Sequence, residues 1–167
     1  MDDKKKMKEK FLNLVDMHQG IIHKILSVYT YNIEDREDLL QEIMLQLWKS
    51  FPGFLGKSAF STWLYKVALN TALLHKRKNM KEKYTLDSMI ESRAQQIGLS
   101  RNDTTISLYM AIDQLGPIDK AIALLYLEQK SYSEIENILG IKKNNIGVRI
   151  SRIKDKLKKI FEYEQQL

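Results

Sequence analysis

The sequence predicts an all-α fold of two small helical domains joined by a flexible linker. Hydrophobic residues make up 44% of the 167 residues, which is enough for a folded core. Only seven glycines and two prolines interrupt the chain, while the helix formers leucine, lysine and glutamate are abundant. Apolar residues also recur at three- and four-residue steps, as the buried side of a helix requires. We expect an N-terminal domain over residues 1–83, a linker over 84–105 and a C-terminal domain over 106–167.

The N-terminal domain should begin with two helices. The first is expected from about residue 5 to 29, with a partly buried His18 on its apolar stripe. The second should cover about 34–50, capped by Asn32 or Asp35, with acidic residues in its first turn where the helix dipole favours them. The stretch FPGFLGKS that follows holds a proline and two glycines, and it should be a loop.

A third helix should start at FSTWLYKVALNTALLHKRK, residues 60–78, and end near 80–83. One stripe of this helix holds Trp63 together with Phe60, Leu64, Val67 and Thr71. We therefore expect Trp63 to pack in the core against the second helix rather than to stack on a base.

Residues 84–105 lose the helical period and gain serine, asparagine, aspartate and threonine. We interpret this stretch as the linker, whose first half could hold a helical turn. Helices are expected again over about 106–114, 117–128, 131–139 and 143–162. The second of these begins at Gly116-Pro117, because proline fits the first position of a helix.

Composition excludes several classes of protein. There is no cysteine, which excludes disulfides and thiolate metal sites and suits a reducing compartment. The first residues, MDDKKKMKEKF, lack the form of a signal peptide, and no apolar run is long enough to span a membrane. His18 and His23 do not share a helix face, and His75 stands alone in the sequence. We expect a cytoplasmic protein with no metal, no cofactor and no small-molecule substrate.

Basic residues gather in two places. Residues 142–160 hold eight basic residues against one acidic residue, and residues 76–83 hold five against one. Two such patches suggest a polyanion that is contacted twice, although lysine-rich faces are often simply solvated.

The stretch SYSEIENILGIKKNNIGVRISRIKDKLKK, residues 131–159, has the pattern of a helix-turn-helix. Ser131 and Glu134 have the spacing of a capping box, and Gly140 can close the first helix in the left-handed conformation. One face of the second helix is apolar and would be buried: Ile146, Ile150, Ile153, Leu157 and Ile160. The opposite face carries Asn145, Val148, Arg149, Arg152 and Lys156, which suit base edges and phosphates in a major groove. An ordinary helical hairpin with a basic face is the alternative.

The second helix, within REDLLQEIMLQLWKSF at 36–51, has an exposed leucine. Its buried stripe should be Leu39, Leu40, Ile43, Met44 and Leu47. Leu45 falls on the other face, among Asp38, Gln41, Glu42 and Lys49. A single exposed leucine is ordinary, but one ringed by polar side chains also fits a small protein-docking patch, and the residues alone do not decide between these.

These motifs together resemble an RNA polymerase sigma factor of the extracytoplasmic-function type. The resemblance rests on REDLLQEIMLQLWKSF, then on the stretch from Phe54 to Ala72, and then on SYSEIENILGI, in that order. It covers roughly residues 8–83 and 106–161. It implies a subunit without catalytic activity that binds core RNA polymerase and directs it to promoters, with duplex and melted promoter DNA as partners. An anti-sigma protein is an expected further partner, and no membrane insertion is implied.

The resemblance also implies roles for single residues. The second helix would dock on polymerase through Asp38, Gln41, Glu42, Leu45 and Lys49. The residues implied at the minus-ten element are Phe54, Leu55, Gly56, Lys57, Ser58, Lys66, Asn70, Arg77 and Lys78, of which Phe54 and Asn70 would hold a flipped base. Those implied at the minus-thirty-five element are Lys142, Lys143, Asn144, Asn145, Val148, Arg149, Ser151, Arg152 and Lys156.

The chain departs from the family pattern at four positions in these regions. Leu55 replaces a basic or polar residue, Lys142 replaces the usual Ser or Thr cap, and Gly147 and Ser151 are small at reading positions. Two other functions remain as alternatives: a free-standing helix-turn-helix regulator, and a nuclease that uses the acids of EDREDLLQE on a metal.

Overall fold

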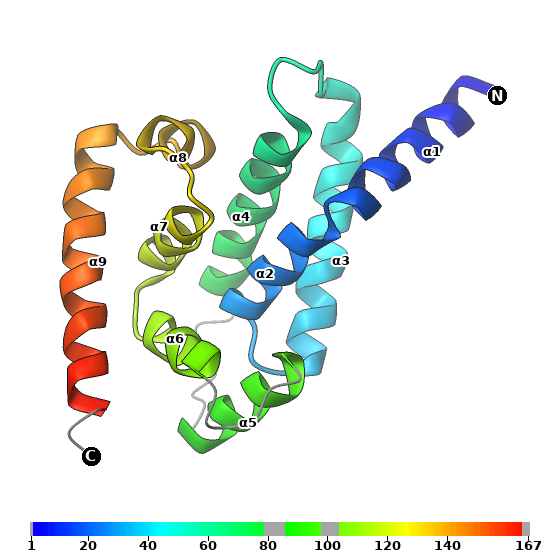
Figure 1. Ribbon diagram of the computed structural model, residues 1–167. Helices are drawn as coiled ribbons and strands as arrows, with labels where there is room; N and C mark the ends of the chain where they lie inside the picture. Colours follow the sequence, from blue (N-terminus) through cyan, green and yellow to red (C-terminus); the bar gives the residue numbers. More distant parts are fainter. Residues whose placement is uncertain (1, 79–85, 98–103, 165–167) are drawn as a thin grey trace.

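Helices account for all the regular secondary structure in the part of the chain that the structure describes. The structure is a computed structural model that describes residues 2–78, 86–97 and 104–164 (Figure 1). The predicted all-α class is confirmed in this part of the chain. The elements are α1 (Asp2–Met17), α2 (Gln19–Tyr29), α3 (Ile33–Ser50), a 3₁₀ turn (Phe51–Gly53), α4 (Phe60–Lys78), α5 (Leu86–Ile97), α6 (Thr104–Asp113), α7 (Pro117–Leu127), α8 (Tyr132–Leu139) and α9 (Lys143–Glu164).

The N-terminal unit is built on α4, which packs against both α2 and α3. The predicted stripe of α3 is confirmed, because Leu39, Ile43 and Leu47 are fully buried. Of the two caps predicted for α3, Asn32 is the one that forms: its side-chain oxygen accepts a hydrogen bond of 2.7 Å from the backbone N–H of Asp35. The predicted end of α4 near residues 80–83 lies outside the described residues, as does the part of the basic patch beyond residue 78.

The prediction of a single first helix is wrong, because the chain forms two helices that meet at His18. The backbone N–H of His18 bonds to Val15 O and that of Ile21 bonds to His18 O, each at 3.0 Å, so a tight turn replaces the α-helical ladder. The His18 ring donates from Nδ1 to Leu14 O at 2.8 Å and packs on Phe60. His18 is half-buried, as predicted, and the continuous apolar stripe conceals the bend between the two helices.

The predicted linker also contains more structure than its composition indicated. Residues 86–97 form the three-turn helix α5, which packs against α6. Its sequence, LDSMIESRAQQI, contains good helix formers such as Leu, Met, Glu, Arg, Ala and Gln, which the interpretation as a linker passed over. The rest of the predicted linker up to Asp103 lies outside the described residues.

The C-terminal unit follows its local sequence signals closely. Pro117 is the first residue of α7, as predicted. Ser131 and Glu134 form the predicted capping box, and Gly140 ends α8 with φ 70° and ψ 19°. A side chain at Gly140 would be strained in this left-handed conformation, which explains the glycine.

The two units share one hydrophobic core. α8 packs on α4, and α7 packs on both α2 and α4 (Figure 1). Polar contacts reinforce this junction: Tyr29 OH donates to Pro117 O at 2.7 Å, and Lys24 pairs with Glu128 at 2.7 Å. Burial raises the pKa of the Tyr29 hydroxyl far above its usual range, so the hydroxyl stays neutral and acts as the donor. α7 and α8 thus lie between α4 and α9, and α9 is on the outside of the molecule.

Candidate nucleic-acid interface

Trp63 contacts three phenylalanine rings in an aromatic cluster that holds the loop before α4. Its ring lies 5.1 Å from that of Phe54, 5.3 Å from Phe60 and 6.1 Å from Phe51, centre to centre. Trp63 is half-buried and packs against the core, which confirms its predicted place. The loop residues after Phe54 are exposed: Leu55, Gly56, Lys57 and Ser58. The aromatic cluster therefore fixes the start of a loop whose other residues are exposed.

Phe54 and Asn70, which we expected in one pocket, line two separate hollows. Phe54, Leu55 and Gly56 line a hollow of about 480 Å³. Asn70 is exposed on α4 and lines another, of about 290 Å³, between α3 and α4. The predicted phosphate contacts Lys66, Arg77 and Lys78 are all exposed on α4. Lys78 borders the Asn70 hollow, so an amide and a cation meet there.

The predicted docking face of α3 forms a hollow of about 380 Å³ against the end of α4. Its lining is Asp38, Gln41, Glu42, Leu45, His75 and Lys78. Leu45 is 49% exposed, as the sequence predicted for this position. Lys49 is also exposed on α3 but lies outside this lining. An apolar side chain in a polar rim is the arrangement expected of a docking patch.

The helix-turn-helix is formed by α8, the turn at Gly140 and α9. The Ser131 hydroxyl accepts from the Glu134 backbone N–H at 3.2 Å, and the Glu134 carboxylate accepts from the Ser131 N–H at 2.7 Å. The Ser131 bonds hold the pKa of the Glu134 carboxyl below its usual range. Ile146, Ile150 and Ile153 of α9 are buried, as predicted, while Leu157 and Ile160 are half-buried.

The outer face of α9 carries most of the predicted DNA-reading side chains. Those that are exposed to solvent are Lys142, Lys143, Asn144, Asn145, Val148, Ser151, Arg152 and Lys156. Figure 1 shows no other helix covering the outer side of α9. A helix whose buried stripe fixes it and whose free face holds amides and cations can enter a major groove.

Comparison with known proteins decides the family. The family model of sigma-70 region 2 matches residues 14–82, and that of sigma-70 region 4 matches residues 105–157. Together they span well over half of the chain and match the two helical units in order. The chain belongs to the sigma-70 family, as an extracytoplasmic-function sigma factor.

Curated relatives and a solved structure agree with this placement. The sigma factor is 29% identical to the ECF RNA polymerase sigma factor SigW of Bacillus subtilis, over 93% of this chain and 91% of the relative. It is 25% identical to the RNA polymerase sigma-H factor of Pseudomonas aeruginosa, over 84% and 81% of the two chains. The sigma factor RpoE from Bartonella quintana, solved with the anti-sigma factor NepR, has the same fold, with a TM-score of 0.67 and 17% identity over 95% of this chain and 98% of that one.

Two cations on α9 of this sigma factor have partners within the protein. Arg149 Nη1 donates to Asp119 Oδ1 of α7 at 2.6 Å, and Lys156 Nζ donates to Gln114 O at 2.7 Å. Arg149 is therefore drawn toward α7 instead of pointing straight outward. The sequence could not reveal this pair, because 30 residues separate its members.

His75, which stands alone in the sequence, has two acidic partners in the fold. It is buried, its Nε2 donates to Asp35 Oδ1 at 2.6 Å, and its Nδ1 lies 3.4 Å from Glu42 Oε2. Asp35 and Glu42 share a face of α3 two turns apart, which a sequence search for helix packing could have noted. The histidine thus links α4 to the docking face of α3.

Among residues 2–78, 86–97 and 104–164, no cluster of three or more histidine or acidic side chains could hold a metal ion. Nor does that part of the chain contain a helix long and apolar enough to cross a membrane.

Proposed function

We propose that this sigma factor binds core RNA polymerase through the α3 face around Leu45 and directs it to promoters with two DNA-reading surfaces. The exposed leucine among Asp38, Gln41 and Glu42 carries the docking part of the proposal. An exposed apolar group ringed by polar side chains is a small interface core with a rim.

The first reading surface is the N-terminal unit, which acts on the minus-ten element. The exposed loop after Phe54 and the exposed amide of Asn70 offer an apolar surface and hydrogen bonds to unpaired bases. Lys66, Arg77 and Lys78 add positive charge along α4. Because the two hollows are separate, we assign them to different parts of the melted strand.

The second reading surface is α9, which reads the minus-thirty-five element in the major groove. We assign the exposed side chains of Asn144, Asn145 and Arg152 to base edges, and the exposed lysines at both ends of the face to phosphates. Arg149 would have to exchange Asp119 for a base or phosphate on binding.

We further propose the division into domains at 1–83, 84–105 and 106–167, a role without catalysis, a cytoplasmic location and control by an anti-sigma protein. The last rests on the solved relative, which was captured with an anti-sigma factor.

Transcription in vitro tests the function. Bacterial core polymerase, the protein and a promoter selected by that mixture should give specific transcripts that core alone does not give. Leu45→Arg protein should fail in this assay while still binding minus-thirty-five duplex. DNA binding by the free protein, with no association to core, would favour the free-standing regulator.

A further inference from the structure

We propose that Lys6 and Lys10 of α1 extend the single-strand surface at the loop of residues 51–56, as phosphate contacts for the melted promoter strand. The proposal rests on the proposed function, since it extends the surface that meets the melted strand. These lysines were not among the residues that the sequence singled out, because α1 lies about 45 residues before the loop in sequence.

The two lysines line the hollow of about 480 Å³ beside Phe54. Its lining is Lys6, Met7 and Lys10 from α1, with Phe51, Pro52, Phe54, Leu55 and Gly56 from the loop. All of these residues are apolar, proline, glycine or lysine, so the hollow pairs an apolar wall with positive charge. That combination suits nucleotides, whose bases are apolar on their faces and whose phosphates are anionic.

The wall is built to stay in place. Phe54 packs on Trp63 and Phe60 of α4, and Gly56 turns the chain with φ 69°. Leu55 is left 72% exposed at the rim. An exposed leucine next to a braced phenylalanine offers a base a surface that is already ordered before binding.

α1 is held against this wall by its own aromatic contact. The Phe11 ring lies 5.1 Å from Trp48 and 5.2 Å from Phe51, centre to centre, in edge-to-face geometry. Phe11 follows Lys10 directly, so the packing that fixes the phenylalanine also fixes where the lysine emerges. Lys6 and Lys10 are one helical turn apart, about 6 Å along the axis, and can follow neighbouring phosphates of one strand.

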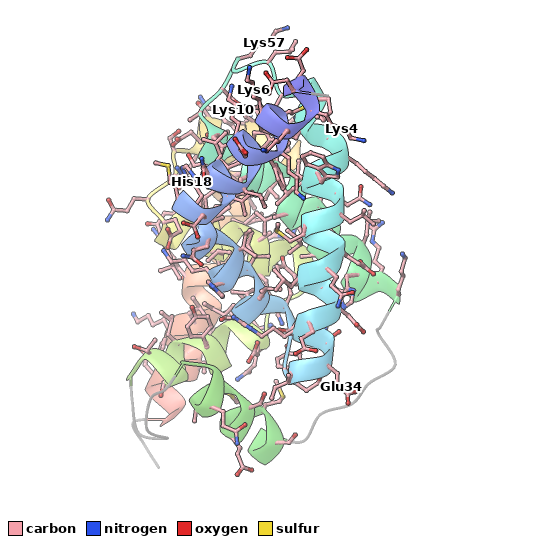
Figure 2. All side chains as sticks on the ribbon, turned by 90° about the vertical axis from the view of Figure 1, so that its right-hand side faces the viewer. Lys4, Lys6, Lys10, His18, Glu34 and Lys57 are labelled. Atoms are coloured by element: carbon pink, nitrogen blue, oxygen red, sulfur yellow. The ribbon has the colours of Figure 1, made fainter. Side chains whose placement is uncertain are left out.

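The two lysines are available to a polyanion. Lys6 pairs with Asp2 at 2.5 Å, but both side chains are highly exposed, and such a pair within one helix is weak and exchangeable. Figure 2 shows Lys6, Lys10 and Lys57 at the same end of the molecule, with Lys4 on the other side of α1. α1 therefore presents two cations at the hollow, and Lys57 of the loop adds a third at the same end of the molecule.

A matched pair of variants separates this site from general charge effects. Lys6→Gln/Lys10→Gln removes the two charges at the hollow. Lys4→Gln/Lys8→Gln removes two charges with the same spacing from the other flank of α1, where both residues are exposed. Both variants keep helix-forming side chains, and circular dichroism checks that each folds.

The measurement is the affinity of the reconstituted holoenzyme for promoter DNA with a preformed bubble over the minus-ten region, from about 0.05 to about 0.3 M salt. The slope of log affinity against log salt should shrink by about 1.4 for Lys6→Gln/Lys10→Gln, because each single-strand phosphate contact contributes about 0.7. Affinity at about 0.1 M salt should fall on the order of tenfold. The Lys4→Gln/Lys8→Gln protein should keep most of the wild-type slope.

Equal slopes for the two variants would overturn the proposal while leaving the sigma-factor function intact, provided that wild-type protein still gives specific transcripts. Loss of core-polymerase affinity by Lys6→Gln/Lys10→Gln, with the DNA slope unchanged, would also overturn it and assign the hollow to a protein contact. Failure of the wild-type protein in the transcription assay would instead count against the proposed function itself.

Discussion

Lys120 of α7 donates a hydrogen bond of 2.8 Å to the hydroxyl of Tyr31, which lies between α2 and α3. Lys120 is only 4% exposed, and its ammonium is 3.5 Å from the buried carboxylate of Asp113. A buried cation of this kind requires its acceptors, because desolvation is costly when they are missing. The lysine thus joins the C-terminal unit to the N-terminal one by a polar contact inside an apolar core.

Tyr31→Phe should lower the free energy of unfolding by about 1–3 kcal/mol, since it removes an acceptor from a buried charge without opening a cavity. Urea denaturation measures the change. Tyr126→Phe is the matched control, because Tyr126 is partly exposed and its loss of a hydroxyl should change stability by less than about 0.5 kcal/mol. An equal loss of unfolding free energy in both variants would show that the Lys120 contact does not stabilise the fold more than an exposed hydroxyl does.

Leu45→Arg should weaken binding to core polymerase by at least about tenfold, because the centre of a docking patch carries most of its binding free energy. Its unfolding free energy should stay within about 0.5 kcal/mol of wild type. Leu12→Arg is the control, since Leu12 is 47% exposed on α1, nearly the same as Leu45. Fluorescence anisotropy measures the affinity for polymerase. Equal affinities of the Leu45→Arg and Leu12→Arg proteins would contradict the assignment of the docking face to α3.

Substitutions at Trp63 and at Asn70 should have different effects, the first on stability and the second on promoter opening. Trp63→Phe removes part of the aromatic cluster and should cost about 1–3 kcal/mol of stability. Asn70→Ala should leave stability and polymerase binding near wild type but slow opening of the promoter, which potassium permanganate footprinting reports. The roles would be reversed if Trp63→Phe kept its stability and lost opening.

The capping box should make the stability of the helix-turn-helix depend on pH. Folding lowers the pKa of Glu134, so its contribution is fully present above the unfolded pKa, near 4.5, and is lost as pH falls through the folded value. The difference in melting temperature between wild type and Glu134→Gln should therefore shrink between pH about 5 and pH about 3. The effect should be small because Glu134 is exposed at the surface, and a difference that grows toward acid pH would contradict it.

Gly147→Ala should raise the free energy of unfolding by up to about 1 kcal/mol, since a glycine within a helix is unfavourable. A Cβ atom at this position would lie 3.5 Å from Cε2 of Tyr132, which is ordinary contact, so the fold has room for it. Thermal denaturation measures the gain. A parallel loss of affinity for minus-thirty-five duplex would show that DNA, and not the fold, requires the glycine.

Local signals in the sequence predicted most of the helices. The Gly116-Pro117 start, the Ser131–Glu134 capping box and Gly140 each act within a few residues, and the structure has all of them where the sequence indicated. The exposed Leu45 was likewise visible from its position on the helix face.

Features that leave no signal in the local sequence pattern were missed. The turn at His18 interrupts an apolar stripe that continues on both sides, so periodicity alone cannot show it. His75 finds its carboxylates on another helix, 40 residues away in the case of Asp35, and Arg149 finds Asp119 on α7. The lysines of α1 beside the loop escaped notice for the same reason.

The packing of α8 on α4 has a consequence for how much sigma factor is available to polymerase. α4 is covered on one side by α3, which carries the proposed docking face, and on another by the helix-turn-helix unit. A partner that binds only when the units are apart competes with this internal contact, and its apparent dissociation constant rises as the separated fraction falls. Changes to Tyr65 or Glu128, which meet across the junction at 3.4 Å, would then alter promoter output without touching DNA or polymerase. A weaker junction would therefore raise the apparent affinity of such a partner for the sigma factor.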